Sequence, residues 1–192
     1  MAKIDFKKEL SHLYNPSKKA FSIVDVLSMR FLMIDGHGDP NVAQEYKDAL
    51  ETLFPVAYAI KFLSKNELGR DYVVPPLEGL WWAENMDAFT TARDKSQWDW
   101  TMMIMQPDII TGEMVEQAVE DVRAKKNPPR LDEIRFEEFT EGLSMQIFHS
   151  GPYGEGEIET IDRLHTFIQD QGYQLRGKHH EIYFNSPLRT AP

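Results

Sequence analysis

The residues with the clearest chemical potential lie in the C-terminal segment HHEIYF, residues 179–184. Glu181 lies there beside the apolar residues Ile182 and Phe184. Successive strand residues point to opposite faces, so Tyr183 shares the face of Glu181. A half-buried carboxylate is costly unless another group compensates it. We therefore expect Glu181 to be a functional acid whose pKa is raised by an apolar wall. The alternative is a glutamate on the wet face of an edge strand.

The same segment also invites a metal hypothesis, because it contains His179, His180 and Glu181 in a row. On a strand only His179 and Glu181 could reach one ion, and two ligands do not make a site. The chain has no cysteine, and it shows no HExxH pattern. We predict no metal and no other cofactor.

Four tryptophans are concentrated in two short segments, PLEGLWW and WDWTMMIMQP. Trp98 and Trp100 should share one strand face, whereas Trp81 and Trp82 should point to opposite faces. Large aromatic side chains most often belong to the core. A buried acid together with aromatic walls would instead form a pocket for a flat, apolar or cationic molecule.

These residues need a scaffold of strands and helices, and the sequence predicts one. Two β-rich stretches flank Ser28 between Phe21 and Asn41, and a helical stripe that Pro55 should kink or restart follows. The aromatic strands come next, then a helix capped by Thr111, and the residues Asn-Pro-Pro at 127–129 mark an internal boundary.

The second half repeats the first in outline, since a strand, a Gly-Pro turn, a helix and an aromatic strand recur in order. We predict one α+β domain over residues 1–192, made of duplicated β-α-β units at about 21–126 and 131–192. Antiparallel sheet would carry helices on one side, and a ligand cleft would lie between the halves. The alternative is a single irregular α+β fold with chance similarity.

Composition and charge narrow the function classes. The chain has 192 residues and a net charge of −10, with a pI of about 5.1. Such a chain repels phosphate backbones and anionic lipid, and no apolar run is long enough to span a bilayer. The first residues lack the apolar core of a signal peptide. We expect a cytoplasmic protein that binds neither nucleic acid nor membrane, as a monomer or weak homodimer.

Several segments together resemble the GyrI-like small-molecule-binding family: RFLMIDGHGDPN, PLEGLWW, WDWTMMIMQP, FEEFTEGLSMQIFHSGPY and above all HHEIYFNSPLRTAP. The resemblance runs from about Phe21 to the C-terminus. It implies a duplicated β-α-β-β (SHS2-like) fold with a cleft between the halves, and a glutamate of the last strand at the base of an aromatic pocket. By its position in HEIYF, that glutamate would be Glu181.

The Trp-rich strands resemble a stand-alone subgroup that hydrolyses cyclopropanoid genotoxins. In that interpretation Trp82, Trp98 or Trp100 stacks on the ligand. Glu181 acts as general base on water or as acid toward the opening ring, and Tyr183 hydrogen-bonds the developing oxygen charge. His149 and Tyr153 would lie at the rim.

The second interpretation is a binding module that captures cationic amphiphiles without changing them, as effector domains of multidrug-responsive regulators do. Glu181 would then be the counter-charge of the ligand. The two interpretations differ in whether the bound compound is released altered.

Overall fold

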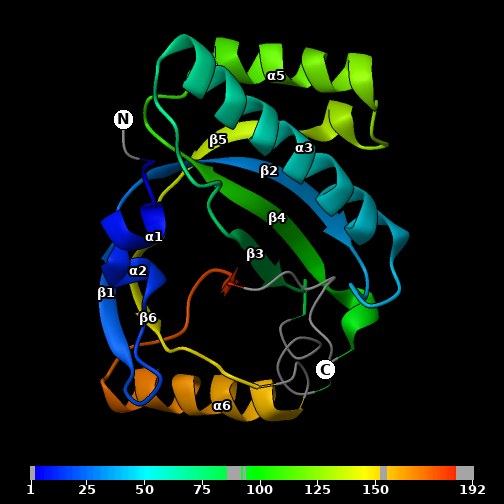
Figure 1. The fold of residues 1–192 in the computed structure, drawn as a ribbon. Coiled ribbons are helices and arrows are strands. Elements are labelled where there is room, and N and C mark those ends of the chain that lie inside the picture. Colours follow the sequence, from blue (N-terminus) through cyan, green and yellow to red (C-terminus); the bar gives the residue numbers. More distant parts are fainter. Residues whose placement is uncertain (1–2, 86–91, 93, 152–154, 185–192) are drawn as a thin grey trace.

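The computed structural model describes residues 3–85, 92, 94–151 and 155–184 (Figure 1). The strands are β1 (Ser22–Val26), β2 (Met29–His37), β3 (Leu77–Trp82), β4 (Asp99–Gln106), β5 (Arg135–Phe139), β6 (Gly142–Gln146) and β7 (His179–Tyr183). The α-helices are α1 (Phe6–Glu9), α2 (Ser11–Tyr14), α3 (Gln44–Glu67), α5 (Gly112–Lys125) and α6 (Glu155–Asp170). Short 3-10 turns cover Lys95–Gln97 and Leu131–Glu133.

Five strands form an antiparallel sheet in the order β5-β2-β4-β3-β7, and β1 pairs with β6 in a separate antiparallel ribbon. The two sheets connect twice at the same level, because Val26 faces Gly142 in the ribbon and Met29 faces Phe139 in the larger sheet. Residues 26–29 and residues 139–142 therefore run next to each other where they connect the two sheets. The predicted break at Ser28 coincides with this passage.

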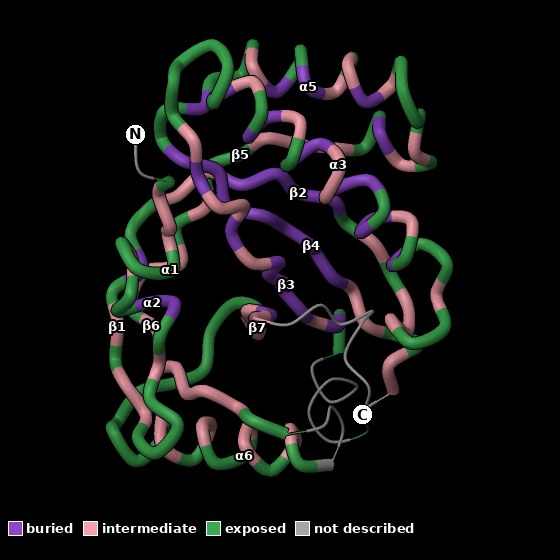
Figure 2. The backbone as a smooth tube through the Cα atoms, in the orientation of Figure 1, coloured by how far each residue is buried: buried purple, intermediate pink, exposed green. Residues whose placement is uncertain are grey.

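Helices α3 and α5 lie together over one face of the five-stranded sheet (Figure 1). The buried residues of β2, β4 and α3 meet there in the main hydrophobic core, which appears as the purple layer of Figure 2. The α3 residues that face this core recur at helical spacing: Tyr46, Ala49, Leu50, Leu53, Val56, Ala57 and Ile60.

Pro55 does not restart α3, although the sequence predicted that it would kink or restart the helix. The helix runs without interruption from Gln44 to Glu67. Val56, Ala57 and Ile60, which follow the proline, have no exposed surface. Their burial against the sheet compensates for the backbone hydrogen bond that a proline cannot donate.

The opposite face of the sheet carries a smaller apolar cluster that includes Phe31, Leu80 and Met103, with Phe6 and Leu10 of the N-terminal segment packed against it. Helix α6 lies far from α3 and α5, on the side of β6 (Figure 1). Helices α3 and α5 thus lie on one side of the sheet, as predicted, whereas α6 contacts β6 of the ribbon.

The predicted mixed α+β class with antiparallel sheets is confirmed, and so is the helix cap, since Thr111 Oγ1 accepts a hydrogen bond from the Met114 amide at 3.4 Å. The internal duplication and the extent of a single domain stay predictions. Within the described residues, no helix is long and apolar enough to cross a membrane.

Candidate functional site

Glu181 and Tyr183 lie on the same face of β7, the edge strand of the larger sheet, as the alternation predicted. Glu181 is paired with Gly79 of β3, and Tyr183 with Leu77. The Tyr183 hydroxyl donates a hydrogen bond to Glu181 Oε2. The same hydroxyl accepts one from Trp81 Nε1 at 3.0 Å. An indole, a phenol and a carboxylate therefore form a chain that leads from the core to the sheet edge.

The pKa of Glu181 is lowered, so the carboxylate is ionised. The rise in pKa that we expected from the sequence was therefore wrong. His179 Nε2 lies 3.3 Å from Glu181 Oε1, and the carboxylate side chain is 23 % exposed. Burial by itself raises the pKa of Glu181, but the hydrogen bond and charge of His179 and the hydrogen bond from Tyr183 lower it below its ordinary value. The carboxylate is thus ionised near neutral pH, where it can accept a proton or attract a cation but cannot donate a proton.

A cavity of about 300 Å³ opens beside this carboxylate. Glu181, Tyr183 and His149 line it, together with Thr160 and Leu164 of α6. His149 Nδ1 lies 2.9 Å from Thr160 Oγ1, which fixes the imidazole to the helix. The structure thereby brings together three of the predicted site residues, while Tyr153 lies outside the described residues.

The three tryptophans that we proposed as ligand contacts, Trp82, Trp98 and Trp100, lie in three different environments. Trp100 is fully buried, contacts Tyr46 edge-on at 5.5 Å and belongs to the main core, so its position does not allow it to contact a ligand. Trp82 lies on the face opposite Glu181, with Lys178 Nζ 3.2 Å from its ring centre. Trp98 is half-buried and meets Trp81 edge-on at 5.8 Å.

None of Trp82, Trp98 and Trp100 is among the described residues that line this cavity or the larger one described below, whose volume is about 560 Å³. Trp81, which we did not select as a ligand contact, donates a hydrogen bond to Tyr183, the residue that is bonded to Glu181. The two-residue period shows that Trp81 and Trp82 face opposite ways, but it does not show which of them accompanies Glu181.

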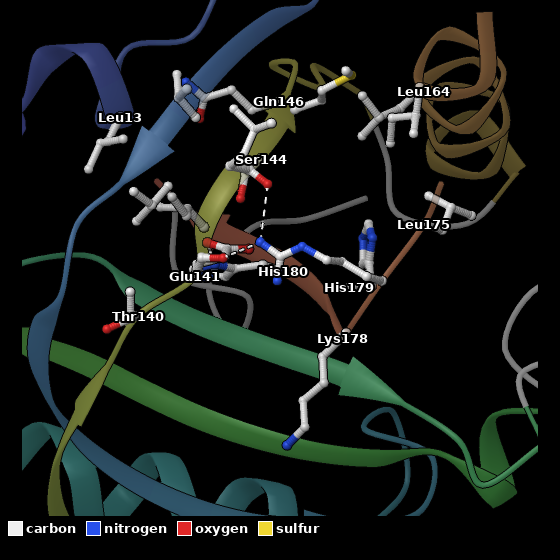
Figure 3. A pocket seen from close by; sticks show the side chains of 18 of the residues that line it. Leu13, Thr140, Glu141, Ser144, Gln146, Leu164, Leu175, Lys178, His179 and His180 are labelled. Carbon is white, nitrogen blue, oxygen red and sulfur yellow. Dashed lines mark hydrogen bonds and ion pairs between the residues drawn. The ribbon is translucent and has the colours of Figure 1, made fainter. Parts of the chain in front are cut away.

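A second and larger cavity, of about 560 Å³, adjoins the first. In Figure 3, Glu141 and His180 lie between Leu13 on one side and Leu164 and Leu175 on the other. Its described walls come from α2, the β1–β6 ribbon, α6, β7 and the segment before β7. Both segments that we predicted as repeats therefore contribute to it.

His180 joins two carboxylates at the wall of this cavity. Its Nε2 lies 3.0 Å from Glu78 Oε2 and its Nδ1 lies 2.9 Å from Glu141 Oε2. Glu78 is 1 % exposed, and its other oxygen accepts a hydrogen bond from the Tyr14 hydroxyl at 2.7 Å. Burial by itself lowers the pKa of His180, but the bonds to both carboxylates raise it to about 10. The imidazole is therefore a cation at neutral pH.

Sequence reasoning missed this cluster, which we call the Glu78–His180–Glu141 cluster. We assigned His180 only to the strand face opposite Glu181 and did not consider Glu78 or Glu141. One signal was available, because Glu78 lies between Leu77 and Gly79 in the apolar segment PLEGLWW, where a carboxylate is as unexpected as in HEIYF. Among the described residues, no three His, Asp or Glu side chains are arranged to hold a metal ion.

The family of GyrI-like small-molecule-binding domains matches residues 19–192, so the chain belongs to this family and is a small-molecule-binding domain. An uncharacterized conserved protein from Listeria innocua has 38 % sequence identity and a TM-score of 0.87, over 99 % of this chain and 94 % of that one.

Two hydrolase structures from Listeria innocua are also similar. One has 38 % identity and a TM-score of 0.86 over 100 % of this chain and 94 % of the other. The second has 37 % identity and a TM-score of 0.80 over 95 % and 94 %. No curated protein matches the chain.

Proposed function

We propose that this protein hydrolyses small molecules that carry a strained, electrophilic ring, and specifically cyclopropanoid genotoxins, with Glu181 as general base. The observation that carries the proposal is the ionised, partly shielded Glu181 carboxylate on the wall of a ligand-sized cavity. Similarity to hydrolases from Listeria innocua over nearly the whole chain supports hydrolysis over simple binding.

The chemistry requires one proton acceptor and one water molecule. Glu181 removes a proton from water while the water oxygen bonds to a cyclopropane carbon. A ring C–C bond breaks, and its electron pair moves into the conjugated system and onto its oxygen. That oxygen then takes up the proton, so the product is the ligand plus water. Ring strain supplies much of the driving force, and general base catalysis typically adds about 10²–10⁴-fold in rate.

We expected Tyr183 to hydrogen-bond the oxygen of the ligand, but its contacts favour a role in positioning Glu181. Its proton is directed at Glu181 and its oxygen accepts from Trp81, so in this conformation it orients the carboxylate. Trp98 lines neither cavity, but it is half-buried and lies against Trp81, which donates to Tyr183. We therefore keep Trp98 as a candidate contact for a part of the ligand that extends beyond the cavity. His149 lines the same cavity and contributes a hydrogen-bonding edge.

The test is to incubate the protein with a cyclopropane-bearing alkylating agent and follow the water adduct by mass spectrometry. We expect multiple turnovers, a loss of about 10²-fold or more in Glu181→Gln, and ligand affinity within about threefold of the original. Glu159→Gln, an exposed change on α6, is the matched control. Equal turnover in Glu181→Gln would exclude the role of general base, and unaltered compound that co-elutes with the protein would indicate a binding module.

A further inference from the structure

Strands β1 and β6 and helix α6 form a layer of their own, which we call the outer layer. Phe21, just before β1, stacks on Phe167 of α6 with ring centres 4.7 Å apart, and α6 also contacts β6. Within the described chain, neither the main core nor the cluster on the opposite sheet face includes a residue of these three elements. Figure 2 accordingly shows the ribbon and α6 mostly in green and pink. Elements with so little buried apolar surface open at low free-energy cost.

Space separates much of the outer layer from the sheet. Residues of α6 and of β7 line both cavities, of about 560 and 300 Å³, where a packed core would otherwise lie. The chain passes between the outer layer and the sheet at residues 26–29, at 139–142 and in the segment 171–178 that leads from α6 to β7. Gly142 has a φ of 74° and Gly177 a φ of 67°, so two of the three connections bend at a glycine.

The third connection is attached to both parts of the molecule, one on each side of Gly177. Arg176 donates to the backbone oxygens of Glu141 and Leu143, at 2.7 and 3.4 Å, so this side follows the ribbon. Lys178 lies over the Trp82 ring of β3 at 3.2 Å, so the other side follows the sheet. The left-handed glycine between these two anchors is therefore a natural pivot.

Glu141 lies in the second connection, and its carboxylate reaches across to the sheet. Its Oε2 is 2.9 Å from His180 Nδ1 on β7, and His180 Nε2 is 3.0 Å from Glu78 Oε2 on β3. The side chains of Glu78 and His180 are 1 % and 11 % exposed, whereas that of Glu141 is 22 % exposed. The buried pair thus belongs to the sheet, and Glu141 is the partner that water can reach and replace.

We propose that the Glu141–His180 ion pair is a latch. It holds the outer layer closed over the two cavities, and the layer opens as one body about residues 26–29, Gly142 and Gly177 when the pair breaks. Over the part of the chain that the structure describes, no other ion pair joins the outer layer or its connections to the sheet. The inference goes beyond the proposed hydrolysis and does not depend on it.

The experiment measures distances between pairs of nitroxide spin labels by pulsed EPR, on cysteines introduced into a chain that has none. Glu51→Cys on α3 and Gln169→Cys on α6 are exposed positions on the two sides of the hinge. We expect one narrow distance distribution in the original protein and a shift to longer distances in Glu141→Ala. Glu141→Gln keeps a hydrogen-bond acceptor without the charge and should shift less. Glu67→Ala, which removes an exposed carboxylate at the end of α3, is the matched control.

Two further label pairs show which parts move. Glu51→Cys with Glu116→Cys on α5 reports on the helices over the sheet, and Ile23→Cys with Gln169→Cys reports on the outer layer. Both distances should stay the same in Glu141→Ala. An unshifted distance between α3 and α6 in Glu141→Ala would overturn the latch, and so would an equal shift in the control variant. A change within either further pair would indicate general loosening and would also overturn it. No substrate enters the measurement, so the latch can stand where the proposed hydrolysis fails, and the reverse.

Discussion

Replacing His180 by leucine tests the charge assignment of the Glu78–His180–Glu141 cluster. The imidazole lies between two carboxylates and its side chain is 11 % exposed. His180→Leu removes both bonds and leaves Glu78, with 1 % exposure, with the Tyr14 hydroxyl as its remaining hydrogen-bond partner among the described residues. Removing one partner of a buried ion pair typically costs about 3–5 kcal/mol. We expect the free energy of unfolding to fall by that amount at neutral pH.

The pH dependence carries more information than the size of the loss. The pKa of His180 is about 10 in the folded protein against an ordinary 6.5, so the charge is more stable in the folded state. Because the folded value is the higher one, this stabilisation is complete below about pH 6.5 and is lost as the pH rises towards about 10. At about 1.4 kcal/mol per pKa unit, its upper limit is about 5 kcal/mol.

The assay is urea denaturation of the original protein and His180→Leu at intervals from about pH 6 to about pH 10. The difference in unfolding free energy should shrink steadily across this range, and tyrosines and lysines that titrate in both proteins cancel. Histidine NMR titration should show one imidazole that stays protonated above about pH 9 and is missing in the variant. His12→Leu, at an exposed histidine, is the control. A difference that is constant with pH would refute the buried imidazolium.

Three further predictions follow from single contacts. Tyr14→Phe removes the hydroxyl that donates to Glu78 at 2.7 Å, and urea denaturation should show a loss of about 1–3 kcal/mol. Gly36→Ala places a Cβ 2.0 Å from the Trp100 ring, which is fully buried and cannot move aside, so urea denaturation should show a loss of about 1–3 kcal/mol or more. Because the pKa of Glu181 is lowered, turnover of a cyclopropane compound should stay level from about pH 7 down to about pH 5 in a pH–rate profile.

Two matched substitutions control the stability predictions. Tyr58→Phe changes a tyrosine that is 49 % exposed on α3, and Gly112→Ala adds a Cβ with no atom within 4 Å. Both should leave the unfolding free energy within about 0.5 kcal/mol, with alanine at Gly112 neutral or favourable. A loss in Tyr14→Phe or Gly36→Ala no larger than in its control would contradict the contact concerned. A fall in turnover between pH 7 and pH 5 would contradict the charge state of Glu181.

The order and type of the main elements were predictable from the sequence, because each depends on a local period. The alternation in HEIYF correctly placed Glu181 and Tyr183 on one face, and Thr111 correctly marked the start of a helix. Pro55 wrongly indicated a restart of the helix, because the burial of the residues after it outweighs the tendency of proline to interrupt a helix.

Only the tertiary structure decided the environment of these side chains. Glu78 and His180 are 102 positions apart and meet because β3 and β7 are neighbours in the sheet. The direction of the pKa shift of Glu181 depends on His179 and Tyr183 outweighing burial, which is a matter of distances. Trp100 and Trp81 share one sheet face in the core, but only Trp81 reaches the site because it lies on β3, the neighbour of β7, whereas Trp100 lies on β4. Periodicity specifies which residues share a face, whereas packing between distant elements specifies what that face meets.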